Sequence, residues 1–402
     1  MSVQQIKMKV SPSPSLRVPE AGEVPHQALF EAEPFAVLGA PRVPTMVTTG
    51  VRPDASTCFG PRGGAVTGTD GSVWISDTGH HRLLGWKSMP EKDGAPADWV
   101  MGQPDFNSEG RNAKGPVNAT TLNVPTGICA CGEGMAVADA WNHRVLIWKQ
   151  CPQDHNVPAD IVLGQADFTS GEGNRGSNRA TADSLHWPYG VTWLDGKLLV
   201  ADSENRRVLI WNGLPETNSQ PADLVLGQTD FVSRNENAGG EPNAMSIRWP
   251  HGIALWHGYL CISDAGNNRI MIWKGIPNQN GTPCDLVLGQ TSTELVDHNQ
   301  SLYWPRANTL NMPYAIASHE DWLLVADTAN SRLLGWHIDD LKTGAAARAL
   351  TGQLNFHDKG DNRWQPPVAD SVCWPYGLQT SGKIVAVADS GNNRVSLWRL
   401  AV

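Results

Sequence analysis

This 402-residue chain lacks long apolar runs. No stretch of it approaches the roughly 20 consecutive apolar residues of a membrane-spanning helix, and its first residues lack the apolar core of a signal peptide. We therefore expect a soluble protein that has no membrane partner and resides in the cytoplasm. Residues 1–34, which include Ser11-Pro12-Ser13-Pro14, have the composition of a flexible or surface-bound tail.

The chain also has fewer basic than acidic residues, and it has few cysteines. The chain has 31 Lys and Arg residues against 40 Asp and Glu, a net charge of −9, which disfavours a broad phosphate-binding surface and argues against nucleic acid as a partner. Its seven cysteines are odd in number and do not recur in the repeats described below, so we expect no shared disulfide framework. Cys129 and Cys131 alternate along one apolar run; a metal-binding pair is one interpretation, and two buried thiols in a core strand are the favoured one.

The chain does have a sixfold internal repeat. A proline opens each copy, and the copies follow one another at intervals of 62 to 64 residues: Pro61, Pro125, Pro188, Pro250, Pro313 and Pro375. The third copy shows the shared sequence most clearly, as WPYGVTW, then GKLLVADSENRRVLIW, then ADLVLGQTDF. A repeat of this length is one supersecondary unit that buries its apolar face only against its neighbours. The repeat therefore decides the fold.

Each copy contains four short apolar runs separated by turn residues. In the third copy the runs are 190–193, 198–201, 208–211 and 223–227, and Asp195-Gly196 between the first two is a hairpin signal. The runs are too short and too rich in β-branched residues to be helices. Six copies of four antiparallel strands predict an all-β protein, a six-bladed β-propeller.

The two ends of the chain predict how the ring closes. The sixth copy stops shortly after its third run, which ends at Trp398, and so has no fourth run. The segment Phe35–Gly39 has the character of that missing run and lies at nearly the expected spacing before Pro61. We expect this N-terminal strand to complete the last blade, because closure removes the exposed sheet edges of an open array. Residues 35–402 would then form a single propeller.

Residues that recur in every copy are expected to serve the blade rather than a site. An aspartate precedes an arginine by five residues in each: Asp77 and Arg82, Asp139 and Arg144, Asp202 and Arg207, Asp264 and Arg269, Asp327 and Arg332, Asp389 and Arg394. Seen six times, this pair is interpreted as a clamp across a tight turn. The tryptophans that end the third runs are interpreted as packing between blades, and the Gly-Gln after the fourth run as scaffold.

These recurring residues resemble a known family. The pattern Pro-x-Gly-Ile/Val followed by Val-Ala-Asp-x-x-Asn-x-Arg-Val resembles the NHL repeat, and the second copy contains Asn142-His143-Arg144-Val145-Leu146. The resemblance covers all six copies and implies the propeller fold. It implies several functions, since NHL propellers include sensors, RNA-binding modules, protein-interaction platforms and amidating lyases. The Gly-Gln strand and the long linkers resemble those of bacterial NHL proteins of unassigned activity.

Residues that vary between copies are the candidates for function. Strand direction alternates, so the turn between the second and third runs and the long linker between copies open on one face of the ring. The residue after each proline should lie there, at the mouth of the central channel: Arg62, Thr126, Tyr189, His251, Tyr314 and Tyr376. Just before the prolines stand His186, Trp187, Arg248, Trp249 and Trp374, and the turns add His80, His81, His143, Arg206 and Asn268.

This set has the chemistry of a ligand site, with amphipathic aromatic walls, titratable histidines and arginines suited to a carboxylate or phosphate. The alternative is that the aromatic residues plug the narrow end of the channel. The linkers, about twenty residues each, are far longer than usual connections. Each ends in a similar phrase with a Ser or Thr cap, as in Ala182-Asp183-Ser184-Leu185, whereas their variable Gly/Asn/Arg tips are expected to decorate the rim.

We expect a non-catalytic propeller that binds a partner protein or a small ligand on the linker-bearing face, without a cofactor or metal. The alternative is a metal-assisted lyase or hydrolase at the channel mouth, since the amidating lyases hold zinc with three histidines there. Only His251 occupies the mouth register here, with His186 near it. The lactonase-type propellers use carboxylates and asparagine in the channel, and the mouth register has no acid. Single-stranded RNA binding through stacked aromatic residues is a third possibility.

Overall fold

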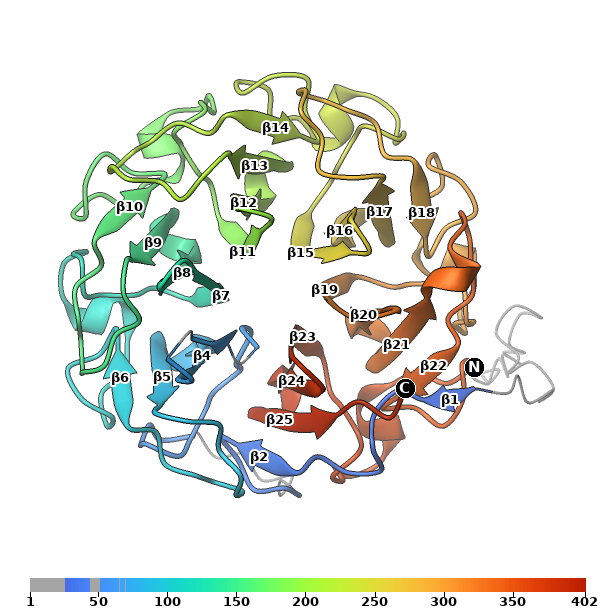
Figure 1. Ribbon diagram of the computed structural model, residues 1–402, viewed down its shortest axis with the longest axis horizontal. Coiled ribbons are helices and arrows are strands. Elements are labelled where there is room, and N and C mark those ends of the chain that lie inside the picture. Colours follow the sequence, from blue (N-terminus) through green and yellow to red (C-terminus); the bar gives the residue numbers. More distant parts are fainter. Residues whose placement is uncertain (1–25, 44–50, 65, 69) are drawn as a thin grey trace, which may run out of the picture.

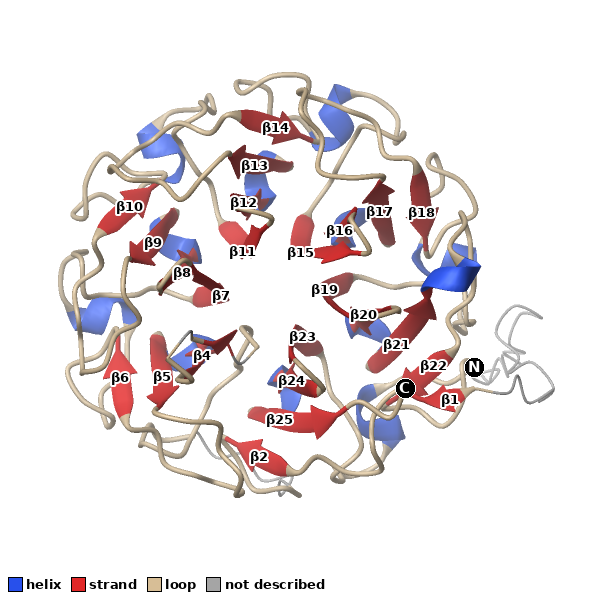
Figure 2. Ribbon diagram, viewed as in Figure 1, coloured by secondary structure: helices blue, strands red, loops and turns tan. Residues whose placement is uncertain are grey.

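The computed structural model describes residues 26–43, 51–64, 66–68 and 70–402. They form a ring of six antiparallel sheets arranged around a central axis (Figure 1). The six-bladed propeller expected from the repeat is therefore confirmed. Short 3-10 turns connect the strands, and Figure 2 shows them distributed around the ring.

The blades follow the chain, and each is listed from its innermost strand outward. Blade 1 contains β3 (Val66–Thr67), β4 (Val73–Asp77), β5 (Arg82–Trp86) and β6 (Trp99–Met101). Blade 2 contains β7 (Pro125–Cys131), β8 (Gly134–Asp139), β9 (Arg144–Trp148) and β10 (Ile161–Leu163). Blade 3 contains β11 (Pro188–Leu194), β12 (Lys197–Asp202), β13 (Arg207–Trp211) and β14 (Leu224–Leu226).

The second half of the ring repeats this order. Blade 4 contains β15 (Pro250–Trp256), β16 (Tyr259–Asp264), β17 (Arg269–Trp273) and β18 (Leu286–Leu288). Blade 5 contains β19 (Pro313–His319), β20 (Trp322–Asp327), β21 (Arg332–His337) and β22 (Ala349–Thr351), with β1 (Gln27–Ala28) added at its outer edge. Blade 6 contains β23 (Pro375–Ser381), β24 (Ile384–Asp389), β25 (Arg394–Arg399) and β2 (Ala36–Leu38).

The 3-10 turns occupy two recurring places. Between the second and third strands of the blades lie η2 (Thr78–His80), η4 (Ala140–Asn142), η6 (Ser203–Asn205), η8 (Ala265–Asn267), η10 (Thr328–Asn330) and η13 (Ser390–Asn392). In the linkers lie η3 (Arg111–Lys114), η5 (Gly173–Gly176), η7 (Glu236–Gly239), η9 (His298–Ser301) and η12 (Asp361–Trp364). One further turn, η11 (Ile338–Asp340), follows β21.

The core lies between the blades. The second and third strands are buried on both faces, because each blade packs against a neighbour on either side. Leu163 of blade 2 and Val200 of blade 3 belong to one such inter-blade cluster, together with Trp211. The packing role predicted for the tryptophans is confirmed, and each indole of blades 1 to 5 also donates to a carbonyl nine residues later, as Trp211 does to Gln220 at 3.0 Å.

The N-terminal strand closes the ring as expected. β2 pairs antiparallel with β25, with Val37 opposite Ser396, and supplies the fourth strand of blade 6. Residues 26–30 also pack on the ring: β1 pairs in parallel with β22, and the side chains of Leu29 and Phe30 are buried. The first and last described parts of the chain thus lie together, as Figure 1 shows.

The Asp–Arg pairs are buried clamps. In blade 3 the Nε of Arg207 donates to Oδ2 of Asp202 at 2.8 Å, and neither side chain is exposed. The other nitrogens of Arg207 donate to the carbonyls of Thr181, Ser184 and Phe231, which belong to the linkers before and after the blade. The other five blades repeat this arrangement. The predicted turn clamp is confirmed, and it also anchors both linkers.

The linkers follow the expected design at their ends but not at their tips. The hydroxyl of Ser184 accepts from the backbone N–H of Thr181 at 2.9 Å, so the predicted Ser/Thr cap is present. The expectation that the tips only decorate the rim is wrong. The tips hold a buried asparagine with left-handed backbone, such as Asn174 at φ 49°, whose amide exchanges hydrogen bonds with Asn205 in the blade. A short polar side chain tolerates this conformation better than most residues.

Candidate functional site

The residues at the channel mouth touch one another. The ring of His251 lies 4.2 Å, centroid to centroid, from both Tyr189 and Tyr314. Tyr314 lies 4.6 Å from Tyr376, and the guanidinium of Arg62 lies over the Tyr376 ring at 4.8 Å. Five of the six predicted mouth residues thus form one continuous group, which we call the aromatic layer.

Local backbone geometry explains this convergence. Each inner strand of blades 2 to 6 begins at its proline, and the pairing register shifts just after it. The inner strands also approach each other closely, since a Cβ placed on Gly190 would lie only 1.9 Å from the carbonyl oxygen of His251. In five of the six copies a glycine two residues after the proline therefore lets neighbouring blades bring their mouth residues together, and the fifth copy has Ala315 there.

The aromatic layer separates two cavities. The larger, of about 340 Å³, extends along the inner strands toward the turns between the first and second strands. The smaller, of about 180 Å³, lies on the linker side and is lined by Arg62, Trp187, Tyr189, Ser203, Glu204, Trp249, His251 and Tyr314. We call them the channel cavity and the mouth pocket. Four residues of the layer, Arg62, Tyr189, His251 and Tyr314, line both.

His251 is neutral within this layer. Its Nδ1 lies 2.9 Å from the carbonyl oxygen of Trp249, so Nδ1 is the protonated nitrogen and Nε2 is left as an acceptor. The side chain is only 6% exposed, and burial lowers the pKa of His251 to about 3. The layer thus combines a neutral imidazole, which has one buried acceptor, with three tyrosine rings and the guanidinium of Arg62.

This pKa predicts a pH effect on stability. The unfolded chain takes up a proton at His251 below about pH 6.5, whereas the folded chain does so only near pH 3. The titration of His251 therefore does not affect the free energy of unfolding above about pH 6.5. As the pH falls from 6.5 toward 3, it lowers this free energy by up to about 1.4 kcal/mol per pH unit. In His251→Phe, which keeps a buried ring, we expect a shallower dependence of the free energy of unfolding between pH 6.5 and 4. Identical pH profiles in urea denaturation would contradict the assignment.

The other predicted site residues lie around the layer. Thr126 is fully buried, and its hydroxyl donates to the carbonyl of Tyr189 at 2.8 Å, which ties blade 2 to blade 3. Arg248 lies over Trp249 at 5.3 Å and forms an ion pair with Glu236. Trp374 is 49% exposed and lines neither cavity.

The histidines of the turns join the blades. The Nδ1 of His143 accepts from the backbone N–H of Trp187 at 3.0 Å, and His81 accepts in the same way from Val124 in the next blade. Burial, with the nearby His186, lowers the pKa of His143 to about 4. His186 itself packs on His143 at 5.0 Å and accepts from Arg234 at 3.2 Å. His80 bonds to Asp77 at 2.8 Å in the clamp of blade 1.

Sequence reasoning missed several residues that line the cavities. Glu204 and Ser203 of the mouth pocket lie in the turn between Asp202 and Arg207. This Asp–Arg pair is present in all six copies, so its turn was interpreted as part of the scaffold. Gln379 and Thr192 of the channel cavity stand four residues after their prolines. Copies two to six hold Cys, Thr, Ala, Ala and Gln at that register, and this variation was the available signal.

Among residues 26–43, 51–64, 66–68 and 70–402, no three His, Cys, Asp or Glu side chains converge as metal ligands would. In the same part of the chain, no helix is long and apolar enough to cross a membrane.

Comparison with known proteins supports the propeller fold and nothing more specific. No known family profile matches the chain. No curated protein sequence matches it either. Among solved structures, Kuenenia stuttgartiensis hydrazine synthase is similar with a TM-score of 0.51 and 12% identity, over 89% of this chain and 99% of that chain. A streptogramin B lyase structure has a TM-score of 0.44 and 14% identity, over 87% and 94% of the two chains. At 12% identity the likeness to hydrazine synthase shows a propeller fold alone.

Proposed function

We propose that this protein is a non-catalytic propeller that binds a small ligand in the mouth pocket on its linker-bearing face. The fold fits a binding role, and the observation that carries the proposal is the lining of this pocket. Trp187 and Trp249 contribute flat apolar walls, while Glu204 and Arg62 add one charge of each sign. Such a lining suits a small molecule with a flat apolar body and polar ends.

The charges narrow the choice of ligand. Glu204 pairs with Arg206 at 3.3 Å, and its side chain keeps 28% of its surface exposed, so it remains available to an ammonium group. Arg62 suits a carboxylate because its guanidinium donates two parallel hydrogen bonds. An aromatic amino acid, or the amine derived from it, therefore matches the mouth pocket in both shape and charge.

A matched pair of tryptophan variants tests the proposal. Trp187 and Trp374 precede the proline in their copies, have left-handed backbone at φ 54° and 50°, and are 37% and 49% exposed, but only Trp187 lines the pocket. We expect L-tryptophan, L-tyrosine, tryptamine or tyramine to raise the melting temperature of the wild type and of Trp374→Ala. Trp187→Ala should lose most of this shift. The proposal is rejected if none of the four compounds stabilises the wild type, or if both variants respond alike.

A partner protein is the second candidate function. Exposed aromatic side chains stand around the linker-bearing face, including Phe59 at 48% and Trp141 at 40% exposure, and such residues are enriched in protein interfaces. A partner bound there would be weakened by Phe59→Ala and Trp374→Ala, neither of which alters the mouth pocket lining.

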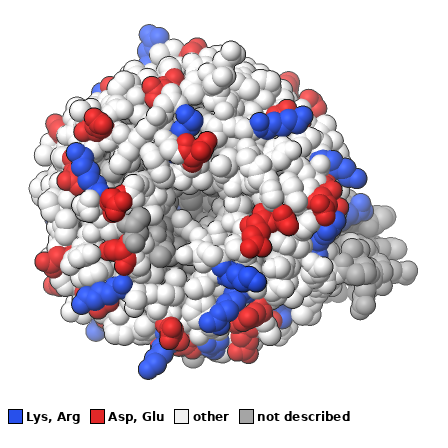
Figure 3. Space-filling view, viewed as in Figure 1, with Lys and Arg blue, Asp and Glu red and all other residues white. Residues whose placement is uncertain are grey.

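The proposal also covers the type of repeat, the cellular compartment and the domain organisation of the chain. We propose that the repeats are of the NHL type, as Asn142-His143-Arg144-Val145-Leu146 suggests, and that residues 35–402 act as one propeller in the cytoplasm. A metal-assisted reaction and RNA binding find less support. Figure 3 shows acidic and basic side chains interspersed over one face of the ring, without a continuous basic surface there.

A further inference from the structure

The channel cavity is a second concave space, on the other side of the aromatic layer from the mouth pocket. The inner strands line it as far as Thr380 and Ser381 at the end of β23. Its outer end therefore lies near the turns between the first and second strands, on the face opposite the linkers. Figure 3 shows a hollow at the centre of the ring.

The lining of this cavity carries a single charge. Arg62 is the one charged side chain among its described lining residues, which otherwise are apolar, small or neutral polar. The guanidinium of Arg62 is half-buried and lies over the ring of Tyr376 at 4.8 Å. No carboxylate is among the described residues that line the channel cavity, whereas Glu204 lines the mouth pocket, which Arg62 also lines.

Among the residues that the structure describes, the guanidinium of Arg62 has no counter-charge on the channel side of the aromatic layer. Burial acts to lower the pKa of Arg62, but the tyrosines around it outweigh this and raise the pKa, so the side chain stays a cation. An anion in the channel cavity would form a charge-assisted pair with this cation. The neighbouring His251 is neutral, so the site offers one positive charge and matches one negative charge.

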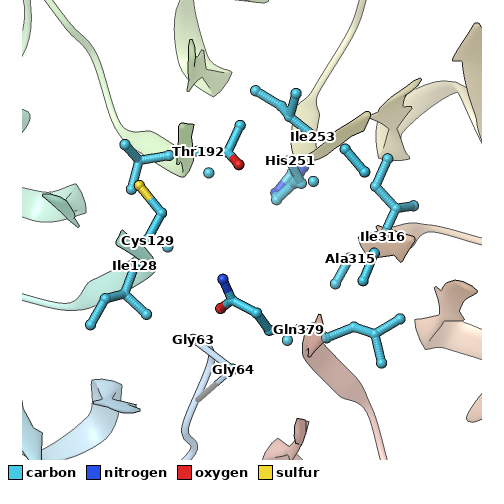
Figure 4. A pocket seen from close by; sticks show the side chains of 18 of the residues that line it. Gly63, Gly64, Ile128, Cys129, Thr192, His251, Ile253, Ala315, Ile316 and Gln379 are labelled. Atoms are coloured by element: carbon cyan, nitrogen blue, oxygen red, sulfur yellow. The ribbon is translucent and has the colours of Figure 1, made fainter. Parts of the chain in front are cut away.

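Neutral donors and acceptors in the cavity add to this chemistry. Gln379 reaches from β23 toward the middle of the cavity, and Thr192 lies across from it on β11 (Figure 4). An amide and a hydroxyl at these places would hydrogen-bond to polar atoms of a ligand. A phosphate would bring more charge than a single arginine balances, whereas a monocarboxylate fits the fork of one guanidinium.

We propose that the channel cavity binds a short organic monocarboxylate from the face opposite the linkers, with its carboxylate on Arg62 and its body beside Gln379 and Thr192. This site is separate from the mouth pocket, although Arg62 lines both.

Carboxylates and their amides of equal shape test the charge requirement. We expect butyrate or hexanoate to bind the wild type in calorimetry and to raise its melting temperature, and butyramide and hexanamide to do neither at the same concentration. Arg62→Met should weaken carboxylate binding roughly 10- to 100-fold, the strength of hydrogen bonds to charged groups. Arg248→Met is the control, because Arg248 also lies near the mouth but does not line the cavity, and it should bind as the wild type does. Equal binding of the acids and amides, or no binding of either acid, would overturn the inference.

A second pair of variants locates the site and does not depend on the folding of Arg62→Met. Gln379→Trp fills the channel cavity and leaves the mouth pocket intact, whereas Trp187→Ala alters only the mouth pocket. Hexanoate binding should be lost in Gln379→Trp and kept in Trp187→Ala. The reverse pattern would place the anion on the linker side and reject the inference. Since the function proposed for the mouth pocket is tested through Trp187 with aromatic ligands, the two proposals fail independently.

Discussion

Arg207→Met is expected to lower the free energy of unfolding by about 3–5 kcal/mol, the usual cost of removing one partner from a buried ion pair. The substitution leaves the carboxylate of Asp202 buried with the Asn205 amide and one backbone N–H as its remaining hydrogen-bond donors. It also leaves the carbonyls of Thr181, Ser184 and Phe231 without their donor. Buried groups that lose a partner carry the full cost of their dehydration.

An exposed ion pair provides the control for this prediction. Arg348 forms an ion pair with Asp340 at the surface, where its side chain is 41% exposed. Arg348→Met should therefore change the free energy of unfolding by less than about 1 kcal/mol. Chemical denaturation of both variants measures the difference. Equal stability of the two variants would mean that the clamp has no special role in the blade.

Removal of the first 39 residues is expected to open the ring. The truncated chain loses β1 and β2, with the buried side chains of Leu29, Phe30, Val37 and Leu38, and it exposes the edge of β25. Each buried aliphatic side chain contributes about 1.5–3 kcal/mol, so we expect a melting temperature lower by about 10 °C. An unpaired strand edge also promotes association between molecules.

A shorter truncation distinguishes strand loss from a general effect of shortening. Removal of residues 1–25 keeps both β1 and β2, and this variant should melt like the full chain and elute as it does in size-exclusion chromatography. The longer truncation should melt earlier and elute as larger species. If it instead keeps the elution volume and melting temperature of the full chain, β2 does not hold the ring closed.

Much of the fold could be predicted because six copies constrain one another. The Asp–Arg clamps followed from their recurrence in all six copies, since a residue fixed in every copy must serve something present in every blade, and the strand at Phe35–Gly39 followed from its apolar character and its spacing before Pro61. The buried asparagines at the linker tips did not follow. Asn174 and its equivalents stand among Gly, Arg and Asn residues that resemble solvated loop, and their burial depends on how a linker folds back onto the next blade.

The candidate site was predictable in part for a similar reason. The residues after the prolines share one register, and five of them do meet at the channel mouth. The division of the channel into two cavities was not predictable, because it depends on the volumes of Tyr189, His251 and Tyr314 packed together. Spacing along the chain carries no information on how far such side chains fill a space.

The closure of the ring by β2 has a consequence for circular permutation. The backbone N–H of Ala401 donates to the carbonyl of Leu29 at 3.1 Å, so the end of the chain lies beside a segment close to its beginning. A short peptide could therefore join residue 402 to residue 26 without crossing the ring. New termini cut into a linker tip, for instance at Gly176, would leave every blade with four strands supplied by its own copy, and the ring would no longer depend on a strand borrowed from the other end of the chain.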